Sequence, residues 1–217
     1  LIRYDARGHG DSAPSLGNEV YQWRNLGADM RAVADAMDAP TFIAGGMSMG
    51  CATAIHAAVQ APDRIRGLVL AMPPTIWEER VDQRQLYQRI AEHGVEGDAR
   101  AIAKLMSRDM ARTLPPWLAD PGHAANMAIG LRAIDPGAIP AMFHGAAESD
   151  LPPSEALAVL AHIPTLILGW RGDSTHPEAS AHALHRLLPS SELYIAHCRD
   201  DFTSFPLRIK AFASSLA

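Results

Sequence analysis

The sequence contains little of what disulfide-bonded, metal-binding, membrane or nucleic-acid-binding proteins require. Its 217 residues include two cysteines, Cys51 and Cys198, which are too few for a disulfide framework and lack the spacing of a metal site. No uninterrupted apolar run approaches the roughly 18 residues of a membrane helix, and no signal peptide is recognisable. The net charge is −5, and no run of Lys or Arg offsets it. We therefore expect a cytoplasmic protein without a metal ion, a membrane span or a nucleic-acid partner.

The composition is that of an ordinary globular protein. Hydrophobic residues make up 48% of the chain and charged residues 20%, and the length suffices for one buried core with an inserted subdomain. The chain begins with Leu1 rather than Met, inside the strand-like run Leu1–Tyr4. This beginning leads us to expect an N-terminally truncated fold.

Strand-like and helical segments alternate along most of the chain. Residues 65–74 are apolar nearly throughout, which is typical of a strand that is buried on both faces of a parallel sheet. We predict an α/β fold with a mostly parallel sheet, made of a core part at 1–74, an all-helical lid at 75–153 and a second core part at 154–217. Strands are expected at 1–4, 39–46, 65–74, 164–170 and 192–196, and helices at 20–37, 49–60, 178–188 and toward Ala217.

A serine between two glycines separates a predicted strand from a predicted helix. In Gly46-Met47-Ser48-Met49-Gly50, both glycines lack a Cβ and so leave room for a sharp strand-to-helix turn. Such a turn projects the Ser48 hydroxyl clear of the backbone. It also places the Met49 N–H at the electropositive start of the helix, where an oxyanion is favoured. The pattern predicts that Ser48 is a nucleophile; the alternative is a Gly-rich turn in which Ser48 only caps the helix.

Four segments, in order, resemble parts of the α/β-hydrolase fold family, and the resemblance covers nearly the whole chain. YDARGHGDS (4–12) is similar to the loop that precedes the nucleophile turn, and GGMSMG (45–50) to the turn itself. PDRIRGLVLAMP (62–73) is similar to the next strand, and PTLILGWRGDSTHP (164–177) to the strand and turn that carry the acid. The helical segment from Thr75 falls where such proteins carry a lid. The resemblance implies no cofactor, and GGMSMG also lacks the Gly-x-Gly-x-x-Gly spacing of nicotinamide or flavin enzymes.

The resemblance implies a catalytic triad in the order Ser, then Asp or Glu, then His. Asp173 takes the place of the acid, which would hold the imidazole in the right tautomer; the alternative is a turn residue that caps the next helix. The family's His lies in a loop after the last strand, usually as Gly-His. Here that loop reads HCRDD, and we assign the base to His197, although it lies nearer to the strand than usual. The alternative is that His197 is a buried structural histidine.

We expect structural roles for the other histidines that could approach the site. His176, three residues after Asp173, is expected to fix the turn or to line the rim of the pocket. His182 and His185 lie three residues apart on one predicted helix. Two histidines are too few to bind a metal, and a solvent-exposed helix face explains them. The histidines besides His176 for which we expect a structural role are His9, His144, His182 and His185.

The function predicted from these residues is hydrolysis of a small carboxylic ester or a related acyl bond. The alternatives are a non-catalytic protein that lost its base, and an acyltransferase or haloperoxidase-like enzyme on the same fold. The second oxyanion donor would precede Leu1. Because losing one such donor lowers rates about 100- to 1,000-fold, we expect this chain to be poorly active. The sequence does not indicate the oligomeric state.

Five apolar residues of the predicted lid either shape the pocket or pack as the core of the lid. They are Trp77, Leu86, Met106, Trp117 and Met142.

Overall fold

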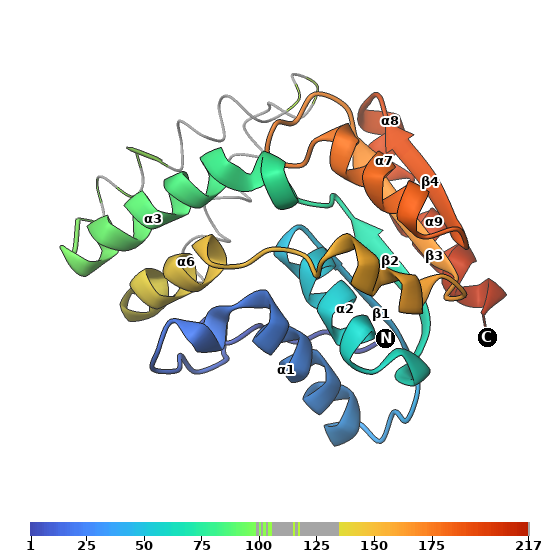
Figure 1. Ribbon diagram of the computed structural model, residues 1–217, viewed down its shortest axis with the longest axis horizontal. Coiled ribbons are helices and arrows are strands. Elements are labelled where there is room, and N and C mark those ends of the chain that lie inside the picture. Colours follow the sequence, from blue (N-terminus) through green and yellow to red (C-terminus); the bar gives the residue numbers. More distant parts are fainter. Residues whose placement is uncertain are drawn as a thin grey trace.

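Four parallel strands form one sheet at the centre of the molecule (Figure 1). The computed structural model describes residues 1–98, 100, 102, 104–105, 115, 117 and 135–216. The strands lie in the order β1-β2-β3-β4, and each pair of neighbours is parallel. Their bounds are Phe42–Met47 (β1), Ile65–Ala71 (β2), Thr165–Trp170 (β3) and Ser191–Ala196 (β4).

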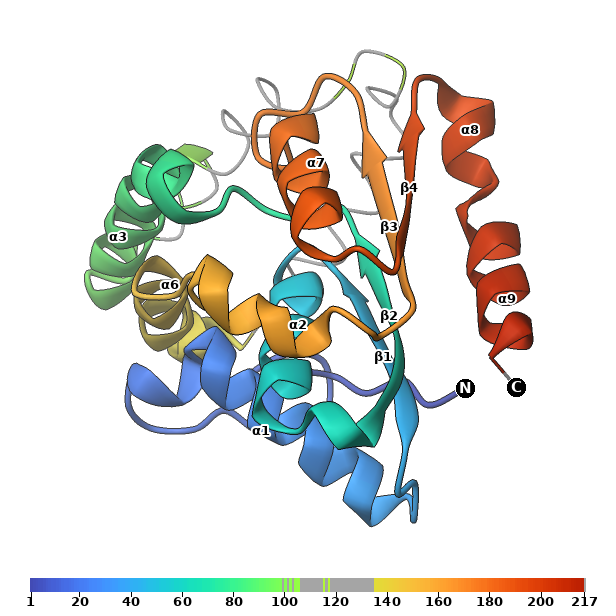
Figure 2. The same ribbon diagram turned by 45° about the vertical axis from the view of Figure 1, so that its right-hand side comes forward.

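Helices cover both faces of the sheet (Figure 2). Helices α1, α2 and α7 lie on one face, and α8 and α9 lie on the other. Their bounds are Trp23–Ala36 (α1), Met49–Gln60 (α2), Glu178–Leu187 (α7), Arg199–Thr203 (α8) and Phe205–Ser215 (α9). Among the described residues, further helices are α3 (Val81–Val95), α6 (Ile139–Ala147) and the short 3-10 turns Glu19–Tyr21, Pro62–Arg64, Trp77–Arg80, Pro136–Ala138 and Ser154–Leu160.

The burial of β3 confirms that the sheet is covered on both sides. All six residues of β3 are buried. Ile167 belongs to the large apolar core under α1, α2 and α7, whereas Leu166 and Leu168 belong to a second apolar cluster that includes Phe205 of α9. Because successive side chains of a strand point to opposite faces, a strand between two helical layers is apolar at nearly every position, and the one polar side chain of β3, that of Thr165, donates to the Ile163 carbonyl.

The parallel register brings two loops together at one edge of the sheet. Met47 pairs with Ala71, and Ala71 pairs with Leu168. The loops that follow β1 and β3 therefore leave the sheet at the same edge, on either side of β2, at the carboxyl ends of the strands. Ligands of open α/β sheets bind at this edge.

The described part of the segment 75–153 is helical, and the pair α3 and α6 forms its centre. Tyr87 of α3 and Phe143 of α6 meet edge to face, with ring centroids 5.5 Å apart. The assignment of 75–153 as a separate lid stays a prediction, because much of this segment lies outside the described residues.

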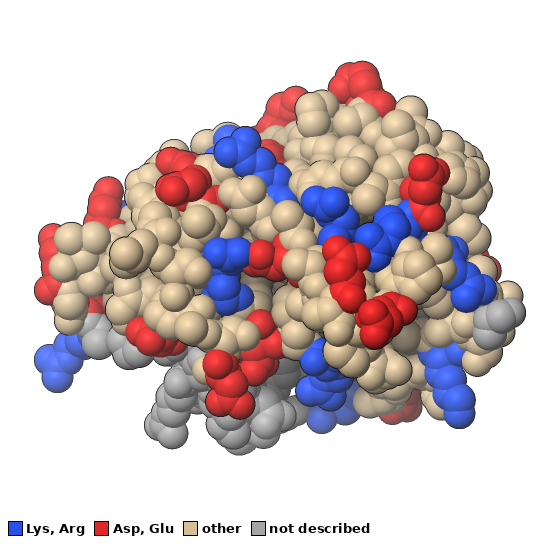
Figure 3. All heavy atoms as spheres, turned by 90° about the horizontal axis from the view of Figure 1, so that it is seen from below, with Lys and Arg blue, Asp and Glu red and all other residues tan. Residues whose placement is uncertain are grey.

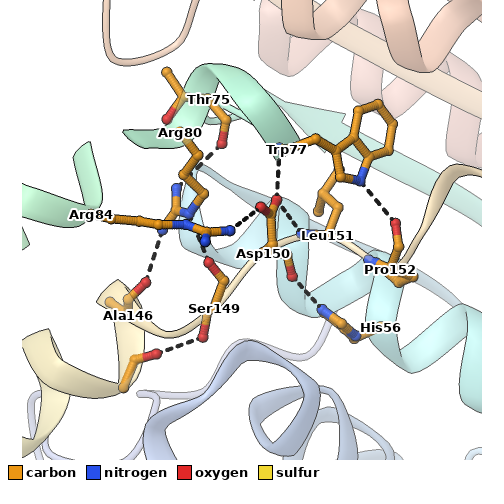
Figure 4. Close-up of polar contacts among 11 residues, drawn as sticks. His56, Thr75, Trp77, Arg80, Arg84, Ala146, Ser149, Asp150, Leu151 and Pro152 are labelled. Carbon is orange, nitrogen blue, oxygen red and sulfur yellow. Dashed lines mark hydrogen bonds and ion pairs between the residues drawn. The ribbon is translucent and has the colours of Figure 1, made fainter. Parts of the chain in front are cut away.

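A buried polar cluster connects this helix pair to the core (Figure 4). Arg80 is fully buried, and its guanidinium donates to the carbonyls of Ser149, Ala146 and Thr75 at 2.8, 3.0 and 3.3 Å. Two of these carbonyls lie at or just after the end of α6, where unpaired carbonyls favour a cation. Arg80 thus ties the end of α6 to the segment that follows β2.

The strand predicted at Leu1–Tyr4 is not formed. These residues are exposed and have no pairing in the sheet, of which β1 is an edge strand within the described residues. A strand-like run of residues is not sufficient for a strand, because a strand is held by backbone hydrogen bonds to a neighbour.

The surface carries both signs of charge. On the face seen in Figure 3, acidic and basic side chains are interspersed rather than gathered by sign. Among the described helices, none has the length and apolar character that crossing a bilayer requires.

Candidate active site

Ser48 occupies a strained turn between β1 and α2. Its φ of 56° and ψ of −114° lie outside the regions that residues with a side chain ordinarily adopt. The turn is possible because Gly46 approaches Gly50 closely: a Cβ on Gly46 would lie 2.5 Å from the Gly50 carbonyl carbon. The prediction that Gly50 is also needed for space is wrong, since a Cβ there would meet no atom within 4 Å. Strain of this kind is typical of functional sites.

His176 contacts the hydroxyl of Ser48. The ring atom Nε2 lies 2.8 Å from Ser48 Oγ, and Nδ1 lies 2.8 Å from Oδ2 of Asp173. An ionised carboxylate can only accept a hydrogen bond, so Nδ1 carries the proton. In the neutral ring, Nε2 then presents a lone pair to which the Ser48 hydroxyl donates. The three side chains form a continuous hydrogen-bonded chain.

Asp173 is held by four donors. Its Oδ2 accepts from His176 Nδ1 and from the indole Nε1 of Trp170, both at 2.8 Å. Its Oδ1 accepts from the backbone N–H groups of Thr175 (2.7 Å) and His176 (3.0 Å). Burial alone would raise the pKa of Asp173, but the hydrogen bonds and the charge of His176, together with the Thr175 N–H, lower it below its ordinary value. The carboxylate is therefore kept ionised in a buried position.

The assignment of the base to His197 does not agree with this geometry. His197 lies between β4 and α8, and its backbone N–H donates to Asp201 Oδ2 at 2.9 Å. Both rings lie in the described part of the chain, and the one within hydrogen-bonding distance of Ser48 is that of His176. The alternative of a buried histidine is also not met, since His197 is exposed. The physical reason is that α8 begins at Arg199, directly after the strand, which leaves a loop of only two residues.

Three of the other histidines in the described part of the chain have partners of their own. His9 lines the cavity beside Ser48, and its Nδ1 lies 3.1 Å from the Arg7 carbonyl. His144 is paired with Glu148 on the half-exposed surface of α6. On α7, His185 bonds with the Ser191 hydroxyl.

Met49 is the first residue of α2, directly after the nucleophile turn. Its N–H therefore has no carbonyl one turn earlier in the helix. The helix start also favours negative charge. This placement is what the oxyanion assignment for Met49 requires, and that assignment remains a prediction.

A cavity of about 110 Å³ opens beside Ser48. Most of its wall is apolar or aromatic, and two of the aromatic residues, Trp23 and Tyr87, have the Arg80 guanidinium over their rings at 4.0 and 5.7 Å. Of the residues of the predicted lid that were expected to shape the pocket, Met142 lines this cavity, whereas Trp77 packs against the main core and Leu86 belongs to an apolar cluster with Ile90. Trp117 packs against Trp170, and Met106 lies outside the described residues.

The comparisons with known proteins agree with this architecture. The family model described as "alpha/beta hydrolase fold" matches residues 1–92. A thermophilic esterase from Thermogutta terrifontis superposes with a TM-score of 0.76 at 21% identity, over 98% of this chain and 78% of the esterase. This chain has the α/β-hydrolase fold. A comparison with the curated proteins finds no match.

Other solved structures with the α/β-hydrolase fold are similar to the same extent. A hydrolase from Pseudomonas aeruginosa PA01 has a TM-score of 0.73 at 22% identity, over 99% of this chain and 78% of that protein. The enol-lactonase from Burkholderia xenovorans LB400 has a TM-score of 0.72 at 19% identity, over 99% and 78%. At such identities the likeness concerns the fold.

Sequence reasoning missed His176 as the partner of Ser48. The order Ser, Asp, His expected for an α/β-hydrolase fold is met by Ser48, Asp173 and His176 as well as by Ser48, Asp173 and His197. The signal was the spacing Asp-x-x-His directly after a buried strand. A tight turn brings residues three apart to one side, so both side chains can face the same strand edge.

Proposed function

We propose that this protein is a serine hydrolase that cleaves a small carboxylic ester or a related acyl bond. One observation carries the proposal: the hydrogen-bonded chain from Ser48 Oγ to His176 Nε2 and from His176 Nδ1 to Asp173 Oδ2, each step 2.8 Å long. A nucleophile, a base and a group that orients the base, all within hydrogen-bonding reach, are the arrangement that acyl transfer through a serine requires.

The mechanism follows from the donors and acceptors. Ser48 Oγ attacks the ester carbonyl while its proton passes to Nε2 of His176, and the oxyanion that forms lies near the Met49 N–H. His176 then donates that proton to the departing alcohol, which leaves an acyl group on Ser48. A water molecule attacks the acyl group, gives its proton to His176, and the carboxylic acid is released as Ser48 regains a proton. Asp173 stabilises the positively charged His176 ring each time that it forms.

The size and wall of the cavity support a small acyl or alcohol group. A volume of about 110 Å³ is well below the roughly 300–1,000 Å³ of pockets that hold drug-sized ligands. The wall is largely apolar, so a short hydrocarbon chain gains by leaving water. The esterase and the enol-lactonase among the similar structures act on bonds of this class by their descriptions, which supports the same class here.

The proposal differs from a non-catalytic protein in one respect that can be measured. The non-catalytic alternative rested on a missing base, and His176 supplies a candidate for that base. An acyltransferase or haloperoxidase-like activity would use the same Ser48 and Asp173, and no further observation favours either one.

A fluorophosphonate probe tests the proposal directly. We expect the probe to label Ser48, with the site identified by peptide mass spectrometry, and Ser48→Ala to abolish both labelling and hydrolysis of p-nitrophenyl acetate. The matched control is Ser12→Ala, which removes a hydroxyl that donates to the Asp5 carbonyl in the exposed loop. Labelling that is absent, or that persists in Ser48→Ala, would contradict the assignment.

A further inference from the structure

Trp170 is the last residue of β3 and touches the proposed catalytic acid. Its indole Nε1 donates to Oδ2 of Asp173 at 2.8 Å, and this is the oxygen that also accepts from His176. We propose that Trp170 is the positioning residue of the proposed triad: it holds the Asp173 carboxylate in the orientation from which the carboxylate aligns the His176 ring. This inference rests on the proposed function.

The need for such a residue follows from where the acid and the base lie. Asp173 and His176 belong to the same short turn between β3 and α7. Gly172, directly before Asp173, has a φ of 88°, so the chain changes direction there. A base and an acid on one loop move together, and neither can fix the other relative to Ser48 on the opposite loop. Trp170 lies on a strand that is buried on both faces, and it therefore ties the turn to the rigid sheet.

The two carboxylate oxygens of Asp173 accept hydrogen bonds from different sets of donors. Oδ1 is fixed by two backbone N–H groups of the turn itself. Among the described residues, the donors to Oδ2 are His176 Nδ1, on the ring that the carboxylate has to orient, and Trp170 Nε1, on the last residue of β3. The indole N–H is thus the donor to Oδ2 that comes from the sheet rather than from the turn that carries Asp173 and His176.

The indole is itself held by packing. Trp170 is only 3% exposed, and its ring meets Phe202 at 5.3 Å and Trp117 at 6.0 Å between centroids. The ring also lies edge-on to His176, with centroids 6.3 Å apart. A buried indole N–H requires an acceptor, and in this apolar surrounding the acceptor is Asp173. The aromatic contacts fix the direction in which the N–H points.

Both variants in the test remove the indole N–H of Trp170, and the second also keeps the size and shape of the side chain. Trp170→Phe and a variant with benzothienylalanine at position 170, in which sulfur replaces the indole N–H, are assayed against p-nitrophenyl acetate and the fluorophosphonate probe. We expect kcat and the labelling rate to fall about 10-fold, because a hydrogen bond to a charged group is lost, while KM is unchanged. We also expect the low-field proton resonance of His176 Nδ1 to shift or broaden.

The matched control is Trp77→Phe. Trp77 also donates its indole N–H, to the Pro152 carbonyl at 3.1 Å, but it does so in the polar cluster around Asp150 (Figure 4), and it does not line the cavity beside Ser48. We expect Trp77→Phe to lower stability without changing kcat or the His176 resonance.

A double-mutant cycle separates positioning from general damage. If Trp170 acts through Asp173, then Trp170→Phe in the Asp173→Asn background should slow the enzyme no further. Full activity of the benzothienylalanine variant, or an equal further loss in the Asp173→Asn background, would overturn the inference. Loss of activity in Asp173→Asn with no loss at position 170 refutes this inference alone. Unchanged activity in both Ser48→Ala and Asp173→Asn refutes the proposed function.

Discussion

His176 Nε2 lies 2.8 Å from Ser48 Oγ, although 128 positions separate the two residues in the chain. Two turns produce this contact. The strained turn after β1 projects the Ser48 hydroxyl from the sheet edge, and the turn after β3 brings His176 to it across the end of β2. Both loops begin at the carboxyl ends of strands that are separated only by β2.

Replacing His176 should remove activity, whereas replacing His197 should not. We expect His176→Ala to lower kcat for p-nitrophenyl acetate and the rate of fluorophosphonate labelling about 1,000-fold, since the base that takes up the serine proton is lost. His197→Ala should leave both rates unchanged, because the group at this position that holds the loop is the backbone N–H, which donates to Asp201. The opposite pattern would restore His197 as the base.

The two glycines of the nucleophile turn should respond oppositely to alanine. A Cβ at Gly46 would lie 2.5 and 2.7 Å from backbone atoms of Gly50, so Gly46→Ala must displace the turn. We expect about 1–3 kcal/mol less stability and loss of labelling. At Gly50 a Cβ meets nothing within 4 Å, and the residue lies inside α2. Gly50→Ala should raise the free energy of unfolding by about 0.5–1 kcal/mol with labelling retained. Urea unfolding and probe labelling of both variants provide the measurement; equal effects would contradict the geometry.

Local patterns predicted the sheet and its helices because each strand and helix carries its own signal. Residues 65–71 and 165–170 are apolar except for Arg66 and Thr165, as is typical of strands between two helical layers. The position of Ser48 was predictable for the same reason, since the motif and its flanking strand and helix are contiguous. Leu1–Tyr4 failed because its apolar pattern does not supply the paired neighbour that a strand needs.

The identity of the base was not predictable from local sequence patterns, because the loops after β3 and β4 each carry a candidate histidine. Which histidine reaches Ser48 depends on how many residues separate each strand from the following helix. After β4, helix α8 begins within three residues, whereas after β3 seven residues precede α7. The longer loop allows the Asp173–His176 turn to form, and this difference is a property of the whole sheet edge rather than of either motif.

His56 should make the protein less stable in mild acid. Its Nε2 bonds to the Asp150 carbonyl at 2.8 Å, and burial lowers its pKa below the ordinary 6.5. The unfolded chain therefore takes up this proton at a higher pH than the folded protein does. The free energy of unfolding should be constant in this respect above pH 6.5 and fall below it, by at most about 1.4 kcal/mol per pH unit, until the lowered pKa of the folded state is passed.

Urea unfolding between pH 8 and pH 5 measures this effect. His56→Gln keeps a donor for the Asp150 carbonyl and does not titrate, so its stability should change less over this range than that of the unaltered protein. Asp173 acts in a separate window. Its pKa lies below the ordinary 3.8, so the stability that it contributes is present above that pH and is lost as the pH falls through the lowered value. If the free energy of unfolding changes equally with pH in His56→Gln and in the unaltered protein between pH 6.5 and pH 5, His56 is not the source of the effect.

Shortening Met142 should change which acyl chains are accepted. Met142 lines the cavity beside Ser48 and is 8% exposed. Met142→Ala removes a flexible chain from the wall, so longer p-nitrophenyl esters should fit. We expect the ratio of kcat/KM for octanoate to that for acetate to rise about 10-fold or more, because one methylene in a pocket changes selectivity by about 10- to 200-fold.

Leu86→Ala is the matched control for Met142→Ala. Leu86 is similarly buried but belongs to an apolar cluster with Ile90 and Ile102, and it does not line the cavity. Both variants should lose stability by about 2–5 kcal/mol, the usual result of truncating a buried apolar side chain, so stability cannot explain a difference between them. If the two variants shift the chain-length profile equally, or if neither does, the cavity beside Ser48 does not hold the acyl group.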